Sequence, residues 1–251
     1  MTKVMGILNV TPDSFSDGGS FNSTERALSQ AIRMVKEGAD IIDVGGESTR
    51  PGAADVALQE ELDRVIPVIE KIKEESDIEV SVDTSKAEVM HEALIQGADM
   101  VNDVRALQEP GALEVCAKAD ATVCLMHMQG QPRSMQLKPE YDDVVKEVAE
   151  FFSLRIKACI EAGLDRSKII LDPGFGFGKT LEHNLQLLAK LDDFTSFNLP
   201  ILVGISRKKM IAELLDDAAI IPSFDVPTNE RLFGSLSAAV IASMKGSAII
   251  R

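Results

Sequence analysis

The chain has 251 residues, a length that fits one (β/α)8 barrel of about 250 residues better than two average domains. Its net charge of -14 argues against binding to nucleic acid or to an anionic membrane, because both carry negative charge. No apolar run approaches the roughly 18 residues of a membrane span, and the first motif begins too early to leave room for a signal sequence. Three cysteines, Cys116, Cys124 and Cys159, lack paired spacing, so we expect buried thiols rather than disulfides or a zinc site. These features predict a cytoplasmic protein.

Short apolar runs alternate with longer helical patterns along the whole chain. The runs are rich in Ile, Val and Leu and do not alternate with polar residues, which is typical of strands covered on both faces. The predicted strands are Val4–Val10, Asp40–Gly45, Val80–Asp83, Met100–Val104, Thr122–His127, Ile169–Asp172, Ile201–Ser206 and Ser247–Arg251. Strands joined by helical crossovers predict a closed barrel first, with an open doubly wound sheet as the alternative.

Helical periodicity is clearest after the second predicted strand. Apolar residues recur there at steps of three and four, at Leu58, Leu62, Val65, Ile69 and Ile72. Pro67 is expected to kink this helix. Two helix starts show a capping-box pattern, Asn22 with Glu25 and Ser85 with Glu88.

No linker or low-complexity stretch divides the chain, so residues 1–251 are predicted to form a single domain. The segment Ile221–Asn229, which contains two prolines, is the expected loop insertion. The eighth predicted strand ends at Arg251, the last residue, so we expect the eighth helix of a full barrel to be absent from this chain.

Polar residues follow nearly every predicted strand, at the end where barrel enzymes carry their chemistry. In chain order they are Asn9, Asp43, Glu47, Asp83, Asn102, Asp103, His127, Asp172, Ser206, Arg207, Lys208 and Arg251. Asp83 and Asp172 suit a ligand edge rich in N–H donors. Lys208 and Arg251, with Arg50 from a loop, suit carbonyl, carboxylate or phosphate oxygens. The predicted ligand is a polar heterocycle with an anionic appendage. For Asp43, Asp103 and His127 the favoured interpretation is a satisfied strand-end polar group.

The segment Pro173–Thr180 is similar to a phosphate-binding loop but fails the pattern, because the first required glycine is Pro173. A dinucleotide-binding pattern fails as well, since Lys179 occupies the position of its last glycine. The glycine-rich turn still allows the backbone to approach a flat ligand, on which Phe177 could stack. The long loops Asn9–Ser20 and Glu47–Ala53 are expected to act as lids over the site.

Six motifs together resemble those of the dihydropteroate synthase family of pterin-binding enzymes, and the resemblance covers essentially the whole chain. They are Gly6–Gly19, Ile41–Ala53, Ser81–Lys86, Val101–Asp103, Leu171–Lys179 and Gly204–Lys208. The resemblance implies a transferase that joins 7,8-dihydropterin-6-ylmethyl diphosphate to p-aminobenzoate with Mg²⁺, releasing diphosphate. It also implies a homodimer and inhibition by sulfonamides, which mimic p-aminobenzoate.

The family pattern further implies roles for individual residues. Pterin-binding residues would be Asp83, Asn102, Asp172, Lys208 and Arg251; diphosphate- and p-aminobenzoate-binding residues would be Asn9, Thr49, Arg50, Pro51, Phe177, Ser206 and Arg251. Asn9 would also lie at the Mg²⁺, and the residues implied to act in catalysis are Asp83, Lys208 and Arg50. Two alternatives remain: a pterin-dependent methyltransferase on the same barrel, and a pterin-binding protein without catalysis. Mg²⁺-dependent release of diphosphate would separate the synthase from both.

Overall fold

The protein is described from a computed structural model, for residues 1–11, 20–48, 55–130, 135, 138–217 and 226–251, with backbone only for residues 20–23. Within these residues lie eight parallel strands: β1 (Lys3–Asn9), β2 (Ile41–Gly45), β3 (Glu79–Asp83), β4 (Met100–Asp103), β5 (Thr122–Met126), β6 (Ile169–Asp172), β7 (Leu202–Val203) and β8 (Ile249–Ile250). Their order is β6-β5-β4-β3-β2-β1-β8-β7. A parallel bridge between Leu171 and Ile201 brings β6 next to β7, so the sheet forms a nearly closed barrel.

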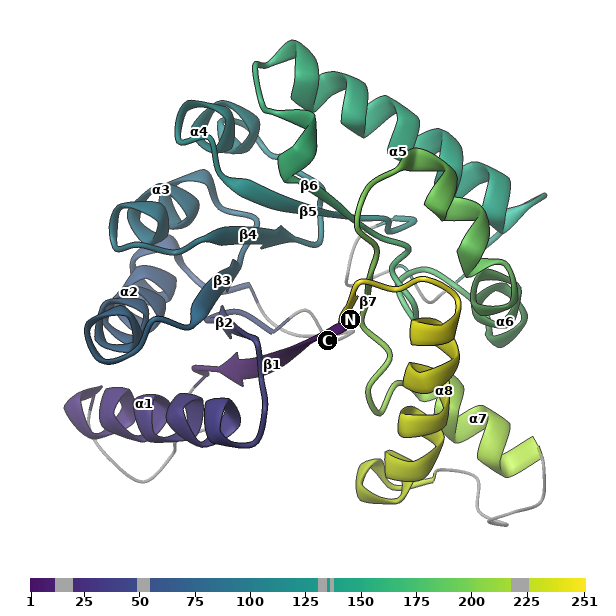
Figure 1. Cartoon of the computed structure of the whole chain (residues 1–251), viewed down its shortest axis with the longest axis horizontal. Helices are drawn as coiled ribbons and strands as arrows, with labels where there is room; N and C mark the ends of the chain where they lie inside the picture. Colours follow the sequence, from purple (N-terminus) through teal and green to yellow (C-terminus); the bar gives the residue numbers. More distant parts are fainter. Residues whose placement is uncertain (12–19, 49–54, 131–134, 136–137, 218–225) are drawn as a thin grey trace.

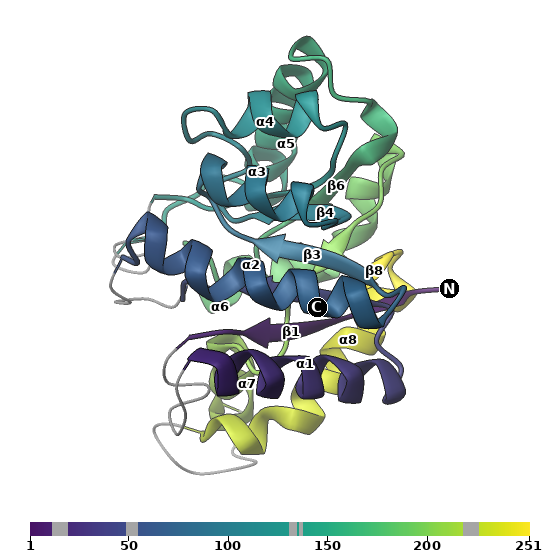
Figure 2. The same ribbon diagram turned by 90° about the vertical axis from the view of Figure 1, so that its left-hand side faces the viewer.

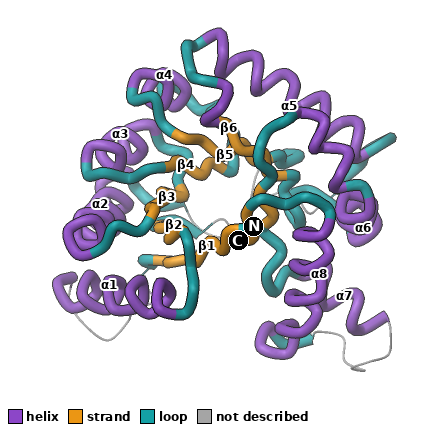
Figure 3. The backbone as a smooth tube through the Cα atoms, in the orientation of Figure 1, coloured by secondary structure: helices purple, strands orange, loops and turns teal. Residues whose placement is uncertain are grey.

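Helices surround the strands, as Figures 1 and 3 show. The α-helices are α1 (Ser20–Lys36), α2 (Leu58–Glu75), α3 (Ala87–Ile95), α4 (Ala112–Lys118), α5 (Val144–Glu161), α6 (Leu181–Ala189), α7 (Lys209–Asp217) and α8 (Leu232–Met244). Short 3-10 helices are η2 (Arg166–Lys168), η3 (Leu191–Phe197) and η4 (Thr228–Arg231). Figure 2 shows α1 and α2 lying along the outer side of the barrel. None of the helices described here is long and apolar enough to cross a membrane.

The predicted barrel is confirmed, and the open doubly wound alternative is wrong because β6 and β7 meet. Two helices, α7 and α8, lie between β7 and β8. Only Arg251 follows β8 in this chain, as expected from the length of the sequence. Residues 228–229 of the predicted loop insertion belong instead to η4, whose N-cap residue is Pro227.

Both capping-box predictions are wrong. Helix α1 begins at Ser20, so Asn22 lies inside it. The Ser85 hydroxyl donates to the Asp103 carboxylate instead of capping α3. A capping box occurs at α6, where Thr180 accepts from the backbone N–H of His183 and the His183 ring accepts from that of Thr180. A histidine ring nitrogen thus replaces the Glu or Gln that the sequence pattern requires.

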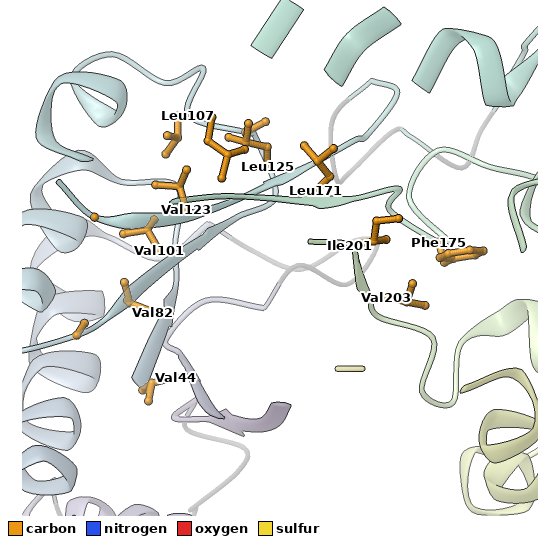
Figure 4. Close-up of a cluster of buried hydrophobic side chains, with 14 of the residues drawn as sticks. Val44, Val82, Val101, Leu107, Val123, Leu125, Leu171, Phe175, Ile201 and Val203 are labelled. Carbon is orange, nitrogen blue, oxygen red and sulfur yellow. The ribbon is translucent and has the colours of Figure 1, made fainter. Parts of the chain in front are cut away.

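The core has two parts because successive strand residues face opposite sides. Val44, Val82, Val101 and Val123 face outward and pack beneath the helices, as Figure 4 shows. A second cluster fills the lower interior of the barrel with residues from seven strands: Met5, Ile41, Met100, Cys124, Ile170, Leu202 and Ile249. This apolar layer separates the polar side chains at the C-terminal strand ends from the N-terminal ends of the strands, where Lys3 pairs with Glu79.

Candidate active site

Strand alternation places the polar residues directly above the apolar interior layer. Asp43 lies two residues after Ile41, and Asn102 lies two residues after Met100. The same step of two leads from Ile170 to Asp172 and from Ile249 to Arg251. Because side chains two residues apart in a strand share a face, all four polar groups turn toward the barrel axis.

The Arg251 guanidinium joins two carboxylates from other strands. Its Nε donates to Asp43 Oδ2, and one of its terminal nitrogens donates to Asp83 Oδ2. The same Asp43 oxygen accepts from Asn102 Nδ2 at 3.1 Å. Four residues from β2, β3, β4 and the end of β8 therefore form one hydrogen-bonded array. Such buried charges are tolerated because each is paired.

Burial shifts the titration of this array. It raises the pKa of Asp83 to about 7, although Arg251 lowers it and Asp43 adds to the rise. On β6, burial also raises the pKa of Asp172, against the charge of Lys208. Burial lowers the pKa of Lys208 to about 8, while Asp172 raises it. The site therefore holds one acid, Asp83, and one base, Lys208, whose pKa values lie close to neutrality, as is common where substrates bind and react.

Two buried oxygens of the site lack a hydrogen-bond partner within the part of the chain that is described. They are Oδ1 of Asp43 and Oγ of Ser81, which are partners in the register of β2 and β3. Nearly all buried polar groups in proteins are satisfied, by protein groups, water or ligand. These oxygens are therefore available to a bound donor beneath the rim of the site.

A second part of the site lies on the turns after β6 and β7. Lys208 donates to the backbone oxygen of Phe175, and its Nζ lies 4.4 Å from the centre of the Phe177 ring. The Asp172 carboxylate accepts from Gly174 N at 2.7 Å. Phe177 is half-buried, so part of its surface is accessible to a ligand. A cation and an aromatic ring side by side suit an aromatic carboxylate.

Known proteins resemble this chain along almost its whole length. A family model described as "Pterin binding enzyme" matches residues 5–251. Dihydropteroate synthase of Escherichia coli K12 is 57% identical over 248 residues, which cover 99% of this chain and 85% of that protein. The sulfonamide complex of the Yersinia pestis enzyme superposes with a TM-score of 0.91 at 55% identity, covering 100% of this chain and 88% of that one. The Xanthomonas albilineans enzyme with 4-aminobenzoic acid gives 0.90 at 46%, covering 100% and 86%.

The chain belongs to the dihydropteroate synthase family. It is therefore a transferase of folate biosynthesis. The identity to synthases across the chain removes the basis for the methyltransferase alternative.

The structure brings together most of the residues that the family resemblance implies. Asp83, Asn102, Asp172, Lys208 and Arg251 surround the upper interior of the barrel. Asn9 lies at the exposed end of β1; its amide oxygen is 3.8 Å from the place that a Cβ on Gly45 would occupy. Ser206 is exposed on the turn after β7. Thr49, Arg50 and Pro51 lie outside the described residues.

The amide oxygen of Asn9 fits a magnesium ion that binds together with the diphosphate of a substrate. No group of three or more His, Cys, Asp or Glu side chains gathers as a metal site among the residues with a described placement. Mg²⁺ is commonly held by one or two protein oxygens together with substrate phosphates and water. The single amide oxygen of Asn9 at the rim fits that arrangement.

Asp43 is the residue whose part in the site the sequence interpretation underrates. The sequence favours a satisfied strand-end group, yet Asp43 binds Arg251 and Asn102, and its Oδ1 has no hydrogen-bond partner among the described residues. The period of two from Ile41 could have placed it inside the barrel. For Asp103 the structural interpretation holds, because it accepts from Ser85 and from two backbone N–H groups.

Proposed function

We propose that this chain condenses 7,8-dihydropterin-6-ylmethyl diphosphate with p-aminobenzoate at the C-terminal strand ends, with residues 1–251 acting as one catalytic domain. The observation that carries this placement is the array of Asp43, Asp83, Asn102 and Arg251 above a closed apolar layer. It offers carboxylate acceptors, an amide and a guanidinium on one face, which matches the alternating donors and acceptors of a pterin ring.

In this proposal Asp83 and Asp172 accept hydrogen bonds from pterin N–H groups, while Asn102 and Lys208 bind its acceptor atoms. Loss of diphosphate leaves a cationic methylene on the pterin, and the two buried carboxylates stabilise that charge. The aniline nitrogen of p-aminobenzoate then attacks the methylene carbon and loses a proton. No protein nucleophile is needed for this sequence of bond changes.

The diphosphate end of the substrate lies toward Asn9, Arg50 and Arg251 in this proposal. Asn9 would hold the Mg²⁺. When bound, the ion neutralises diphosphate oxygens and so assists departure of the leaving group. Arg50 and Arg251 supply further positive charge to the same oxygens.

The p-aminobenzoate lies against Phe177, and Thr49, Pro51 and Ser206 complete its surroundings. The half-buried ring of Phe177, next to the Lys208 amine that binds the pterin, supports this position. The solved relatives with a sulfonamide drug and with 4-aminobenzoic acid support the expectation that sulfonamides compete for this part of the site.

We also propose a homodimer. Helix α8 carries an apolar face whose side chains are between 42% and 83% exposed: Leu232, Phe233, Leu236, Val240, Ile241 and Met244. An exposed apolar face of this extent is typical of an association surface. Sedimentation of the protein and of its Phe233→Glu variant tests this proposal, since a monomeric starting protein would contradict it.

The proposed compartment is the cytoplasm. Three free, buried cysteines support it, because thiols stay reduced there.

The decisive experiment measures diphosphate release from the dihydropterin diphosphate, with and without p-aminobenzoate and Mg²⁺. We expect release to require both, to stop with a chelator and to resume when Mg²⁺ is restored. Pterin binding without release under any of these conditions would favour a binding protein and reject the proposed reaction.

A further inference from the structure

Lys179, which the failed phosphate-loop pattern singles out, is 3% exposed and has an unusual set of neighbours. Its Nζ donates to the backbone oxygens of Gly174 at 3.0 Å, Phe177 at 3.0 Å and His127 at 3.3 Å. The Nδ1 atom of the His127 ring lies 2.9 Å away. One amine therefore binds three points on the turns that follow β5 and β6. None of the family roles stated above uses this amine.

The two turns touch closely enough to exclude side chains between them. A Cβ on Gly174 would lie 1.9 Å from the backbone oxygen of His127, and one on Gly178 would lie 2.4 Å from that of Gln129. Both glycines have positive φ, which L side chains rarely adopt. The Tyr141 hydroxyl adds a hydrogen bond to Gly178 O at 2.9 Å. The turn after β6 is thus held against the turn after β5.

The neighbours of the Lys179 amine suit its protonated form, which can only donate hydrogen bonds. Burial and the neighbouring Lys179 charge lower the pKa of His127 to about 2, so its ring is neutral and Nδ1 accepts when Nε2 carries the proton. All four neighbours of Lys179 are then acceptors. Burial lowers the pKa of Lys179 to about 7; the charge of Asp172 raises it, and that of Lys208 lowers it further.

Phe177 lies between two amines. Lys179 binds its backbone oxygen, whereas Lys208 lies over its ring and binds the backbone oxygen of Phe175. Moving the Phe177 carbonyl would therefore turn the ring relative to Lys208. Lys179 itself is covered, so it reaches the p-aminobenzoate only through Phe177.

We propose that Lys179 is a positioning residue that sets the Phe177 ring against p-aminobenzoate by tying the turn after β6 to His127. The inference rests on the proposed function, because it assumes that Phe177 forms a wall of the p-aminobenzoate site. The alternative is that Lys179 only stabilises the fold.

The test compares the steady-state kinetics of Lys179→Met with those of the starting enzyme. We expect KM for p-aminobenzoate to rise about tenfold or more, because a small displacement of the Phe177 ring that contacts the substrate has a large kinetic effect. KM for the pterin substrate should change less, within about threefold, because Asp83, Asn102 and Arg251 lie on or just after other strands and Asp172 lies on β6 before the turn begins. Lys168→Met is the matched control: Lys168 binds Asp120 at the opposite ends of β5 and β6, and its loss should change neither constant.

Phe177→Ala and the double variant decide how Lys179 acts. If Lys179 works through Phe177, adding Lys179→Met to Phe177→Ala raises KM for p-aminobenzoate no further, because the two effects are not independent. If Lys179→Met does not fold, Lys179→Gln, which keeps an N–H donor, takes its place in the same comparison. A lower melting temperature with unchanged KM, or effects that multiply in the double variant, would overturn the inference. An unchanged KM in Phe177→Ala alone would instead show that the proposed p-aminobenzoate wall is wrong.

Discussion

Asp83 is the residue whose replacement tests the proposed site most directly. It is 8% exposed, and its carboxylate pairs with Arg251 at one oxygen. In Asp83→Ala the pterin loses an ionised acceptor for its N–H groups. Hydrogen bonds to a charged group contribute about 1.5–3 kcal/mol each. For two such bonds the loss is about 3–6 kcal/mol, or roughly a 10²- to 10⁴-fold fall in kcat/KM for the pterin substrate.

The fold should survive this change, because Arg251 keeps its ion pair with Asp43. The assay is diphosphate release at several pterin concentrations, with the circular dichroism spectrum and the thermal midpoint recorded in parallel. Asp99→Ala is the matched control, since Asp99 accepts from Val80 N and pairs with Lys73 at the other end of the same strands. A folded Asp83→Ala enzyme that keeps kcat/KM within about threefold would refute the assigned role.

The remaining predictions concern pH, inhibition and stability. Asp83 has a pKa of about 7 and Lys208 of about 8. We therefore expect kcat/KM for the pterin substrate to fall below pH 7, as the carboxylate is protonated, and above pH 8, as the amine loses its proton. A pH profile that is flat across this range would contradict these roles. Sulfonamides should inhibit competitively with p-aminobenzoate, and noncompetitive kinetics would reject the shared position. Glu61→Ala should lower the free energy of unfolding in urea by about 2 kcal/mol, since it removes a buried carboxylate that pairs with the partly exposed Lys86 and accepts from Thr84, whereas Glu74→Ala at the surface should change it by under about 0.5 kcal/mol.

The strands were predictable from sequence because barrel strands are apolar on both faces. The predicted runs at Asp40–Gly45, Val80–Asp83 and Ile169–Asp172 differ from β2, β3 and β6 by at most one residue. The predicted runs Ile201–Ser206 and Ser247–Arg251 are longer than β7 and β8, which have two residues each. An apolar run records burial, and the chain after Val203 stays buried while leaving the strand for the turn that carries Lys208.

Residues of the candidate site could be predicted from sequence where they lie at the end of a recognisable strand. They could not be predicted where their role depends on a contact with a residue far away in the chain. Asp83, Asn102 and Asp172 follow from position alone. The role of Asp43 depends on Arg251, which is 208 residues away in the chain, so no local pattern shows it. The sequence shows only that the segment containing Lys179 fails the phosphate-loop pattern; the contacts of Lys179 with His127 and two turn carbonyls need the fold to be seen.

The pairing of Arg251 with Asp43 and Asp83 links ligand binding in the pocket to closure of the barrel. The arginine follows β8, the short strand that joins β1 to β7, and its backbone N–H donates to Val203 O at 3.0 Å. An opening that detaches β8 also withdraws the guanidinium and leaves two carboxylates facing each other. A ligand that binds only the closed form stabilises it by mass action. Amide hydrogen exchange in β7 and β8 should therefore slow when pterin is added. The decrease in rate measures how strongly pterin binding stabilises the attachment of β8 to its neighbouring strands.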